Sequence, residues 1–431
     1  MPTRPFLAAL LCFLPGITLA DPAAPAIPNT PAGRALASWL EVFNSGDSAR
    51  MDSFDQTHVP WLSHDKAMGL FARTGGFEFE TVEKSDGLWI MFRAREKATS
   101  KEVLGRLVVM SGDPADINWL SFEAVSPGAK VQEITLDAAE RDHVLESAAK
   151  LLDERYVFPD VGKKLSAALR KAEKRATYQA ITDGQILAWR LSDDLWAIAH
   201  DGHLGVHFTK EVLPNDEPGQ GPDTDPAARQ RLLASNCGFE KAEHLAPNIG
   251  YLKFNVFADP QICAPTASAA MNFVADSDAL ILDLRDNKGG GPMGQFIASY
   301  LFAEPTHLMD NYNRPDNATE EDWTLPYVPG RKFIGKPVFI LTSKRTFSAA
   351  EAFCYALKTL KRATLVGETT GGGAHPIEPH RIDDHFSIIV PTGRSISPIT
   401  KTNWERVGVE PDIKVAAAGA LDEALKRARG P

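Results

Sequence analysis

A serine at the start of a predicted helix is the first candidate for chemistry in this chain. Ser348 follows the apolar run 337–342 and the short segment 343–347, and it begins an alanine-rich run that is typical of a helix. A hydroxyl in this place lies beside the free N–H groups of the first helical turn, which can bind an oxyanion. A serine is also a common helix N-cap, so the position alone leaves both interpretations open.

Candidate partners for this serine lie far from it in the sequence. His203 lies in the segment 199–206, where a predicted helix ends in a tight turn before a strand. Neutral imidazole is the usual base for a serine nucleophile. Glu405, near the C-terminal end, could orient such a histidine as the third member of a triad. A hydrogen-bonded turn histidine and a surface glutamate are the plain structural alternatives for these residues.

A glycine-rich turn could supply donors to the same site. The segment 283–291 follows an apolar run and ends in Gly289, Gly290 and Gly291. Glycine allows the backbone to approach a ligand closely, as an oxyanion hole requires. The spacing fits neither common phosphate-binding pattern.

A metal site is a second interpretation of the histidines. His200, His203 and His207 lie close together in the sequence, but their spacing crosses from a predicted helix into a predicted strand. We therefore expect their side chains to point apart. The chain is predicted to need neither a metal nor another cofactor.

The elements around these residues predict an α/β fold. Apolar runs without alternation predict strands over 250–254, 279–284, 338–342 and 364–366, with helices over 265–276, 294–301 and 348–357. Such strands, joined by helices, indicate a sheet that is covered on both faces. Helical periodicity precedes them over 136–152, 165–172 and 185–198, and the Pro-, Gly- and Asp-rich stretch 213–229 is typical of a linker or loop.

The N-terminal part is expected to form a separate unit. Leu36, Trp39, Leu40 and Phe43 recur at helical spacing, and strand-like runs follow over 77–82, 88–94, 104–110 and 117–122. This order suggests a small α+β cone over residues 31–128.

Residues 1–20 have the pattern of a secretory signal peptide and 21–30 that of a flexible leader, so we expect export to a bacterial periplasm or to the medium.

Composition limits the classes of partner. The chain has 431 residues, 44% of them hydrophobic, and a net charge of −10 without a basic stripe, which argues against nucleic acid. The sequence has no later run long enough to cross a membrane.

Cys237 and Cys263 both lie in loop-like sequence and are the natural pair for a disulfide, whereas Cys354 lies among apolar residues of the helix after Ser348.

Three ordered segments, 283–290, 346–351 and 366–373, resemble the S41 serine peptidases. This family includes the C-terminal processing proteases, the tricorn core protease and the retinoid-binding repeats of the interphotoreceptor protein. The resemblance implies an α/β catalytic domain of the ClpP/crotonase-like spiral type over 241–431, a helical cap over 134–212 and a linker over 213–240. The N-terminal cone, residues 31–128, resembles the NTF2-like (SnoaL-like) superfamily.

The resemblance also implies roles for particular residues. The processing proteases take a lysine base from a Gly-Lys-Gly segment, but this chain has no lysine at 372–374. His203 and Glu405 instead match the histidine and glutamate of the tricorn-like branch. Ser348 is then the nucleophile, His203 the base and Glu405 the residue that orients it. Lys344, on the loop before Ser348, is an alternative base.

By the same resemblance, the oxyanion hole comprises the N–H groups of Gly289, with its neighbour Gly290, and of Ala349. These assignments predict an exported serine peptidase that cleaves peptide or protein substrates through an acyl-enzyme. An oligomer is compatible with the fold by analogy. The alternative is a non-catalytic binder of a lipid or other small apolar ligand on the same fold.

Overall fold

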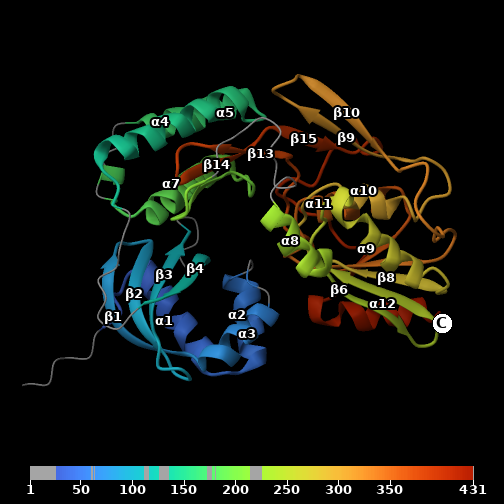
Figure 1. Ribbon diagram of the computed structural model, residues 1–431, viewed down its shortest axis with the longest axis horizontal. Helices are drawn as coiled ribbons and strands as arrows, with labels where there is room; N and C mark the ends of the chain where they lie inside the picture. The colour runs from blue at the N-terminus through green and yellow to red at the C-terminus, as the bar shows by residue number, and fades with distance from the viewer. Residues whose placement is uncertain are drawn as a thin grey trace, which may run out of the picture.

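A computed structural model gives the fold of residues 26–59, 62, 64–110, 116–125, 135–171, 177–179, 181–213 and 226–430. The predicted signal peptide lies outside these residues. Figure 1 shows an N-terminal unit, a group of helices above it and a larger part that carries the C-terminus. Within the described ranges, every helix is too short or too polar to cross a membrane.

The N-terminal unit packs helices against a four-stranded antiparallel sheet. Its helices are α1 (Pro31–Asn44), α2 (Ser48–His58) and α3 (His64–Thr74), and its strands, in sheet order, are β1 (Phe77–Ser85), β2 (Trp89–Glu96), β3 (Glu102–Val109) and β4 (Ile117–Ala124). Trp39 and Phe43 lie one turn apart on α1, and both pack on Phe77 of β1. The strands lie close to the predicted runs, whereas α3 is a helix that the sequence analysis does not predict.

A helical cap follows in the chain. Its elements are α4 (Ala138–Arg155), α5 (Pro159–Arg170), α7 (Gly184–Ala199) and the strand β5 (Gly205–Phe208). Asp137 begins α4 in a reciprocal capping box with Glu140, and Asp183 caps α7 by accepting from the N–H of Ile186. The helix α5 begins earlier than predicted because Pro159 suits the first helical position.

The C-terminal part is built on a six-stranded sheet. In sheet order, its strands are β16 (Ile413–Lys414), β12 (Thr364–Gly367), β11 (Val338–Thr342), β8 (Ala279–Asp283), β7 (Ile249–Phe254) and β6 (Phe239–Leu245). Neighbouring strands are parallel except β6, which is antiparallel to β7. The topology confirms the predicted α/β class.

Both faces of this sheet are covered. Leu280 and Leu282 of β8 lie in a core shared with α9 (Pro260–Phe273), α10 (Met293–Ala298) and α11 (Ala349–Thr359). The alternate residues Ala279 and Ile281 lie in a second core with α12 (Ala420–Ala428). This double coverage explains why the strands are apolar without alternation.

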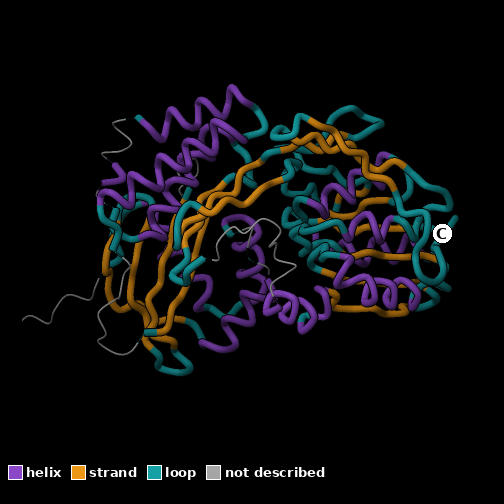
Figure 2. The backbone as a smooth tube through the Cα atoms, turned by 45° about the horizontal axis from the view of Figure 1, so that its top comes forward, coloured by secondary structure: helices purple, strands orange, loops and turns teal. Residues whose placement is uncertain are grey.

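Two small sheets join the helical cap to the C-terminal part. One has the order β13 (Ile377–Arg381), β14 (Phe386–Pro391), β5, and the other has β10 (Ala318–Trp323), β9 (His307–Asn313), β15 (Gly393–Ile396). In Figure 2 these strands run between the cap and the six-stranded sheet. Phe386 and Ile388 of β14 are buried among the cap helices, so the two regions share one core.

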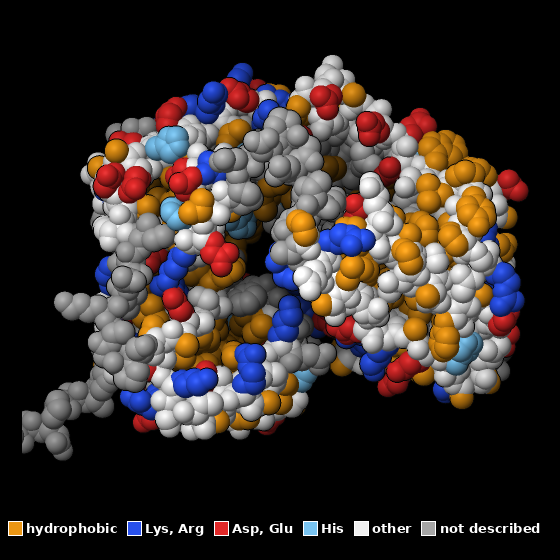
Figure 3. All heavy atoms as spheres, viewed as in Figure 1, with side chains coloured by type: hydrophobic (Ala, Val, Ile, Leu, Met, Phe, Trp, Pro, Cys, Tyr) orange, Lys and Arg blue, Asp and Glu red, His pale blue; other side chains and the backbone are white. Residues whose placement is uncertain are grey.

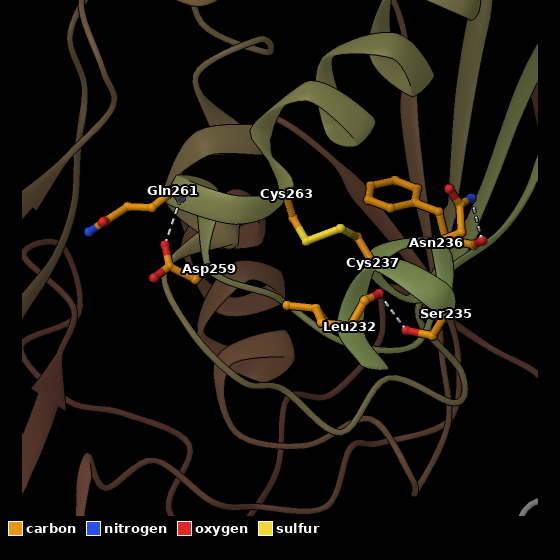
Figure 4. Close-up of a disulfide and its surroundings, with 8 residues drawn as sticks. Leu232, Ser235, Asn236, Cys237, Asp259, Gln261 and Cys263 are labelled. Carbon is orange, nitrogen blue, oxygen red and sulfur yellow. Dashed lines mark hydrogen bonds between the residues drawn. A yellow bond between two sulfur atoms is a disulfide. The ribbon is translucent and has the colours of Figure 1, made fainter. Parts of the chain in front are cut away.

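A disulfide joins Cys237 and Cys263, whose Cα atoms lie 5.8 Å apart (Figure 4). This is the pair expected from the sequence, but neither cysteine lies in an open loop. Cys237 belongs to the short helix η1 (Asn236–Gly238), and Cys263 lies in the first turns of α9, which begins earlier than predicted after its N-cap, Asp259. Likewise, α8 (Pro226–Ala234) is a helix within the predicted linker, of which residues 214–225 lie outside the described part.

Candidate active site

Ser348 lies at the junction of β11 and α11 and is the N-cap of that helix. Its φ and ψ are 57° and −123°, a backbone conformation that costs a non-glycine residue about 1–3 kcal/mol. Its Oγ atom lies 2.9 Å from Nε2 of His203. The serine therefore has the helix-start position expected of a cap and, in addition, a hydrogen-bond partner that could act as a base.

His203 reaches this serine from the turn between α7 and β5. Its ring packs against Phe347 at a centroid distance of 4.7 Å. Gly373 lies on another side, where a Cβ atom would come within 2.7 Å of the ring, so a larger residue would displace the imidazole. Burial lowers the pKa of His203 to about 4, while the nearby Asp201 opposes this change. The ring is thus neutral at neutral pH, the state in which Nε2 can accept a proton.

Asp201 is the carboxylate that contacts His203 most directly. Its Oδ1 accepts a hydrogen bond from the main-chain N–H of His203 at 3.1 Å. Its Oδ2 accepts from Nδ1 of His375 at 2.7 Å and from the hydroxyl of Tyr156 at 3.1 Å. Although burial opposes ionisation, the hydrogen bond from His375 holds the pKa of Asp201 below its usual value. A buried negative charge therefore lies beside the imidazole.

Glu405 lies in the same buried cluster but not against His203. Its Oε2 accepts from the N–H of Ala374 at 2.7 Å and lies 3.6 Å from Nδ1 of His375. Its Oε1 and the Nδ1 of His203 are both buried and have no hydrogen-bond partner among the described residues. Among the described residues, Glu405 therefore does not make the expected direct contact with His203. Burial raises the pKa of Glu405, and His375 opposes the rise.

Glu351 connects the nucleophile helix to the glycine run after β12. It is fully buried, and its Oε2 accepts from the N–H groups of Ser348 at 2.9 Å and Gly373 at 2.8 Å. Its Oε1 accepts from the N–H of Gly372 at 2.7 Å and from the hydroxyl of Thr370. One carboxylate thus fixes Ser348 relative to the loop that packs against His203.

The glycine turn after β8 lies against the nucleophile. A Cβ atom on Gly289 would come within 2.8 Å of the main-chain nitrogen of Ala349 and of the Cβ of Ser348. The N–H of Gly289 donates to Oδ1 of Asn287 at 2.9 Å and is therefore occupied. The N–H groups of Gly290 and Ala349 remain without an acceptor in the described part of the chain. Of the expected donors, these two therefore have no competing acceptor among the described residues.

An apolar cavity of about 120 Å³ opens beside the first turn of α11. Ala349, Ala352 and Phe353 of α11 form one wall, and Leu308 and Met309 of β9 form another. This cavity could hold a small apolar side chain next to Ser348.

The alternative assignments are separated in space. The Lys344 side chain is exposed, and within the described residues Ser348 Oγ is bonded to His203 and not to a lysine. His200 is the C-cap of α7 and packs its ring on Trp196 at 4.8 Å, whereas His207 belongs to β5. The three histidines therefore do not converge as a metal site.

Sequence reasoning did not assign roles to Asp201, His375 or Glu351. Asp201 lies two residues before His203 and Glu351 three residues after Ser348. This closeness in the sequence is the signal that could have identified both carboxylates. His375 follows the glycine run, and the sequence carries no sign that it bonds to Asp201. That contact depends on how distant segments pack.

Comparison with known families gives two adjoining matches. The model of peptidase family S41 matches residues 248–415. The model of the N-terminal domain of peptidase S41 in eukaryotic IRBP matches residues 129–241. Ser348 and Glu405 lie in the first range and His203 lies in the second.

Individual relatives are distant in sequence. Carboxyl-terminal-processing peptidase 2, chloroplastic, of Arabidopsis thaliana is 29% identical over 183 residues, 41% of this chain and 34% of that protein. The tricorn protease of Thermoplasma volcanium is 28% identical over 142 residues, 33% of this chain and 13% of that protein. The solved structure of the photosystem II D1 C-terminal processing protease has a TM-score of 0.41 and 15% identity, covering 64% of this chain and 93% of that one. The matched sequence thus spans only 34% and 13% of these two curated proteins.

Proposed function

Because the chain belongs to peptidase family S41, a family of serine-type peptidases, we propose that it hydrolyses peptide bonds of polypeptide substrates through an acyl-enzyme. Ser348 is the nucleophile and His203 the general base. The observation that carries this proposal is the 2.9 Å distance between Ser348 Oγ and His203 Nε2, at a serine on the N-terminus of a helix.

In the proposed reaction, Ser348 Oγ attacks the substrate carbonyl carbon while Nε2 of His203 takes the hydroxyl proton. The N–H groups of Gly290 and Ala349 stabilise the oxyanion of the tetrahedral intermediate. The imidazolium then gives its proton to the leaving amine, and the C–N bond breaks. Water then attacks the ester carbon while Nε2 of His203 takes its proton, the bond from that carbon to Ser348 Oγ breaks, and the proton passes to Oγ as the carboxylic acid leaves.

We propose that the buried cluster of Asp201, His375 and Glu405 stabilises the protonated form of His203. Asp201 stabilises the imidazolium through its charge, and Glu405 acts on Asp201 through His375 rather than by touching His203. This differs from a direct Ser-His-Glu triad, the arrangement implied by the resemblance. The apolar cavity beside Ala349 would hold the side chain of the acyl residue.

We also propose that the protein is exported. The signal-like pattern of residues 1–20 and the disulfide between Cys237 and Cys263 support this location, because disulfides persist in oxidising compartments.

Labelling with a fluorophosphonate probe tests the nucleophile. The probe should label the wild-type protein, and Ser348→Ala should abolish the label because the attacking oxygen is gone. His203→Ala should slow labelling by about 1000-fold because the hydroxyl then lacks its base. Ser235→Ala, at an exposed serine beside the disulfide, is the matched control and should label like wild type.

Labelling that persists in Ser348→Ala would refute the nucleophile. Absence of labelling in folded wild-type protein would favour the alternative function, a non-catalytic binder of a small apolar ligand.

A further inference from the structure

A second and larger cavity, of about 490 Å³, extends from His203 to the N-terminal unit. One wall is formed by the turn 201–204 and the strand β5. The opposite wall belongs to the N-terminal unit and includes Asn118 and Trp119 of β4. Figure 3 shows that this face of the molecule is hollowed between the N-terminal unit and the rest, with hydrophobic side chains at the edge. A site beside the proposed base is therefore completed by a unit that lies outside the matched family ranges.

The lining is mainly aromatic and aliphatic. Trp119 is 41% exposed, and its ring lies 5.4 Å from that of Trp189 on α7. Ile377 of β13 is also 41% exposed and faces the same cavity. The carboxylates in the lining, Asp193 and Asp201, are both buried, so the accessible surface carries apolar groups together with polar ones such as Asn118 and His207. Such a surface suits a polypeptide with apolar side chains better than a charged ligand.

We propose that this cavity binds an extended segment of the substrate polypeptide beyond the scissile bond, with an apolar or aromatic side chain against Trp119. The N-terminal unit is then a substrate-binding domain. The proposal rests on the proposed function, because the continuity of the cavity with His203 is what identifies the occupant as substrate.

The attachment of the N-terminal unit supports this role. Glu123 of β4 accepts from Lys210, just after β5, at 2.8 Å, and Val108 of β3 is buried in the core of the cap helices. Asp55 of α2 also interacts electrostatically with Arg345, which lies in the segment 343–347 before Ser348: burial raises the pKa of Asp55 to about 7, and Arg345 opposes the rise. The hydrogen bond from Lys210 and the burial of Val108 thus attach the unit to the cap beside the cavity.

Binding to the Ser348→Ala protein tests the proposal without turnover. The probe is reduced, carboxymethylated α-lactalbumin labelled with fluorescein, an unfolded polypeptide whose binding is followed by fluorescence anisotropy. Adding Trp119→Ala should raise Kd about ten-fold because an aromatic contact in the cavity is lost. The control Phe273→Ala, at an aromatic residue that is 52% exposed at the end of α9, should leave Kd unchanged.

Circular dichroism must show that Trp119→Ala is folded, and Ile377→Ser provides a second test in the same cavity if it is not. Equal Kd values for the folded cavity variants and the parent would overturn the proposal. A cavity variant that still binds the polypeptide but no longer binds 8-anilinonaphthalene-1-sulfonate would also overturn the proposal, because the cavity would then hold a small apolar ligand. Fluorophosphonate labelling of Ser348 is a separate measurement, so failure of the substrate-binding role is distinguishable from failure of the proposed function.

Discussion

The imidazole of His203 determines the acid limit of the proposed reaction. Burial lowers its pKa to about 4, whereas an ordinary histidine titrates near 6.5, so protonation should remove the base only in strong acid. We expect kcat/KM for a peptide substrate to stay level from neutral pH to about pH 5 and to fall as the pH approaches 4. Circular dichroism at each pH separates this fall from unfolding. An acid limb near 6.5 would contradict the buried, neutral base.

Two amide variants identify the carboxylate that acts on this ring. Asp201 raises the pKa of His203, so Asp201→Asn should move the acid limb to lower pH. It should also lower kcat by about 100-fold because the imidazolium loses its stabilising charge. Glu405→Gln keeps the shape of the side chain and should shift the limb less. If Glu405→Gln gives the larger shift, Glu405 contacts His203 directly in the working enzyme.

At the scale of elements, Glu351 holds the N-terminus of α11 against the glycine run that follows β12. Its carboxylate accepts from Ser348, Gly372 and Gly373. Glu351→Gln replaces one acceptor oxygen by an NH₂ group that faces N–H donors, so buried donors lose their partner. We expect the free energy of unfolding to fall by about 3 kcal/mol and fluorophosphonate labelling to slow. Urea denaturation measures the first effect.

The matched control is Glu423→Gln on α12. Glu423 accepts from Arg427 at 2.8 Å, but this pair lies on the surface, so the urea midpoint should hardly change. An equally small change for Glu351→Gln would show that the buried carboxylate does not hold the loop.

The elements also show what the sequence can and cannot predict. The parallel strands and the serine at the helix start could be predicted because a buried strand and a helix start leave local patterns. The network around Asp201, His375 and Glu405 could not, because it forms only when the turn before β5 packs against the loops before β13 and after β15. A glycine-rich sequence likewise gives no sign that the side chain of Asn287 accepts a hydrogen bond from the N–H of Gly289. Apart from missed helices such as α3 and α8, the missing part was the set of contacts between distant segments.

At the scale of the molecule, the N-terminal unit is joined to the cap by charge as well as by packing. Arg106 of β3 is buried, and it donates to Glu123 at 3.1 Å. Its Nε also lies 3.9 Å from the carboxylate of Asp183, the N-cap of α7. One guanidinium therefore lies between the two units at the beginning of the helix that lines the larger cavity.

Arg106→Ala should loosen this junction, because Asp183 and Glu123 lose a shared counter-charge. Hydrogen–deuterium exchange in the first turn of α7 should quicken by about ten-fold, while labelling of Ser348 stays near wild type because the catalytic groups are untouched. In the Ser348→Ala background, polypeptide affinity should fall as it does for Trp119→Ala, since the wall carrying Trp119 is no longer held in place. Arg331→Ala removes an exposed pair with Asp276 and should change none of these readouts. Unchanged exchange in α7 would mean that packing around Val108 and Trp189 holds the units together without Arg106.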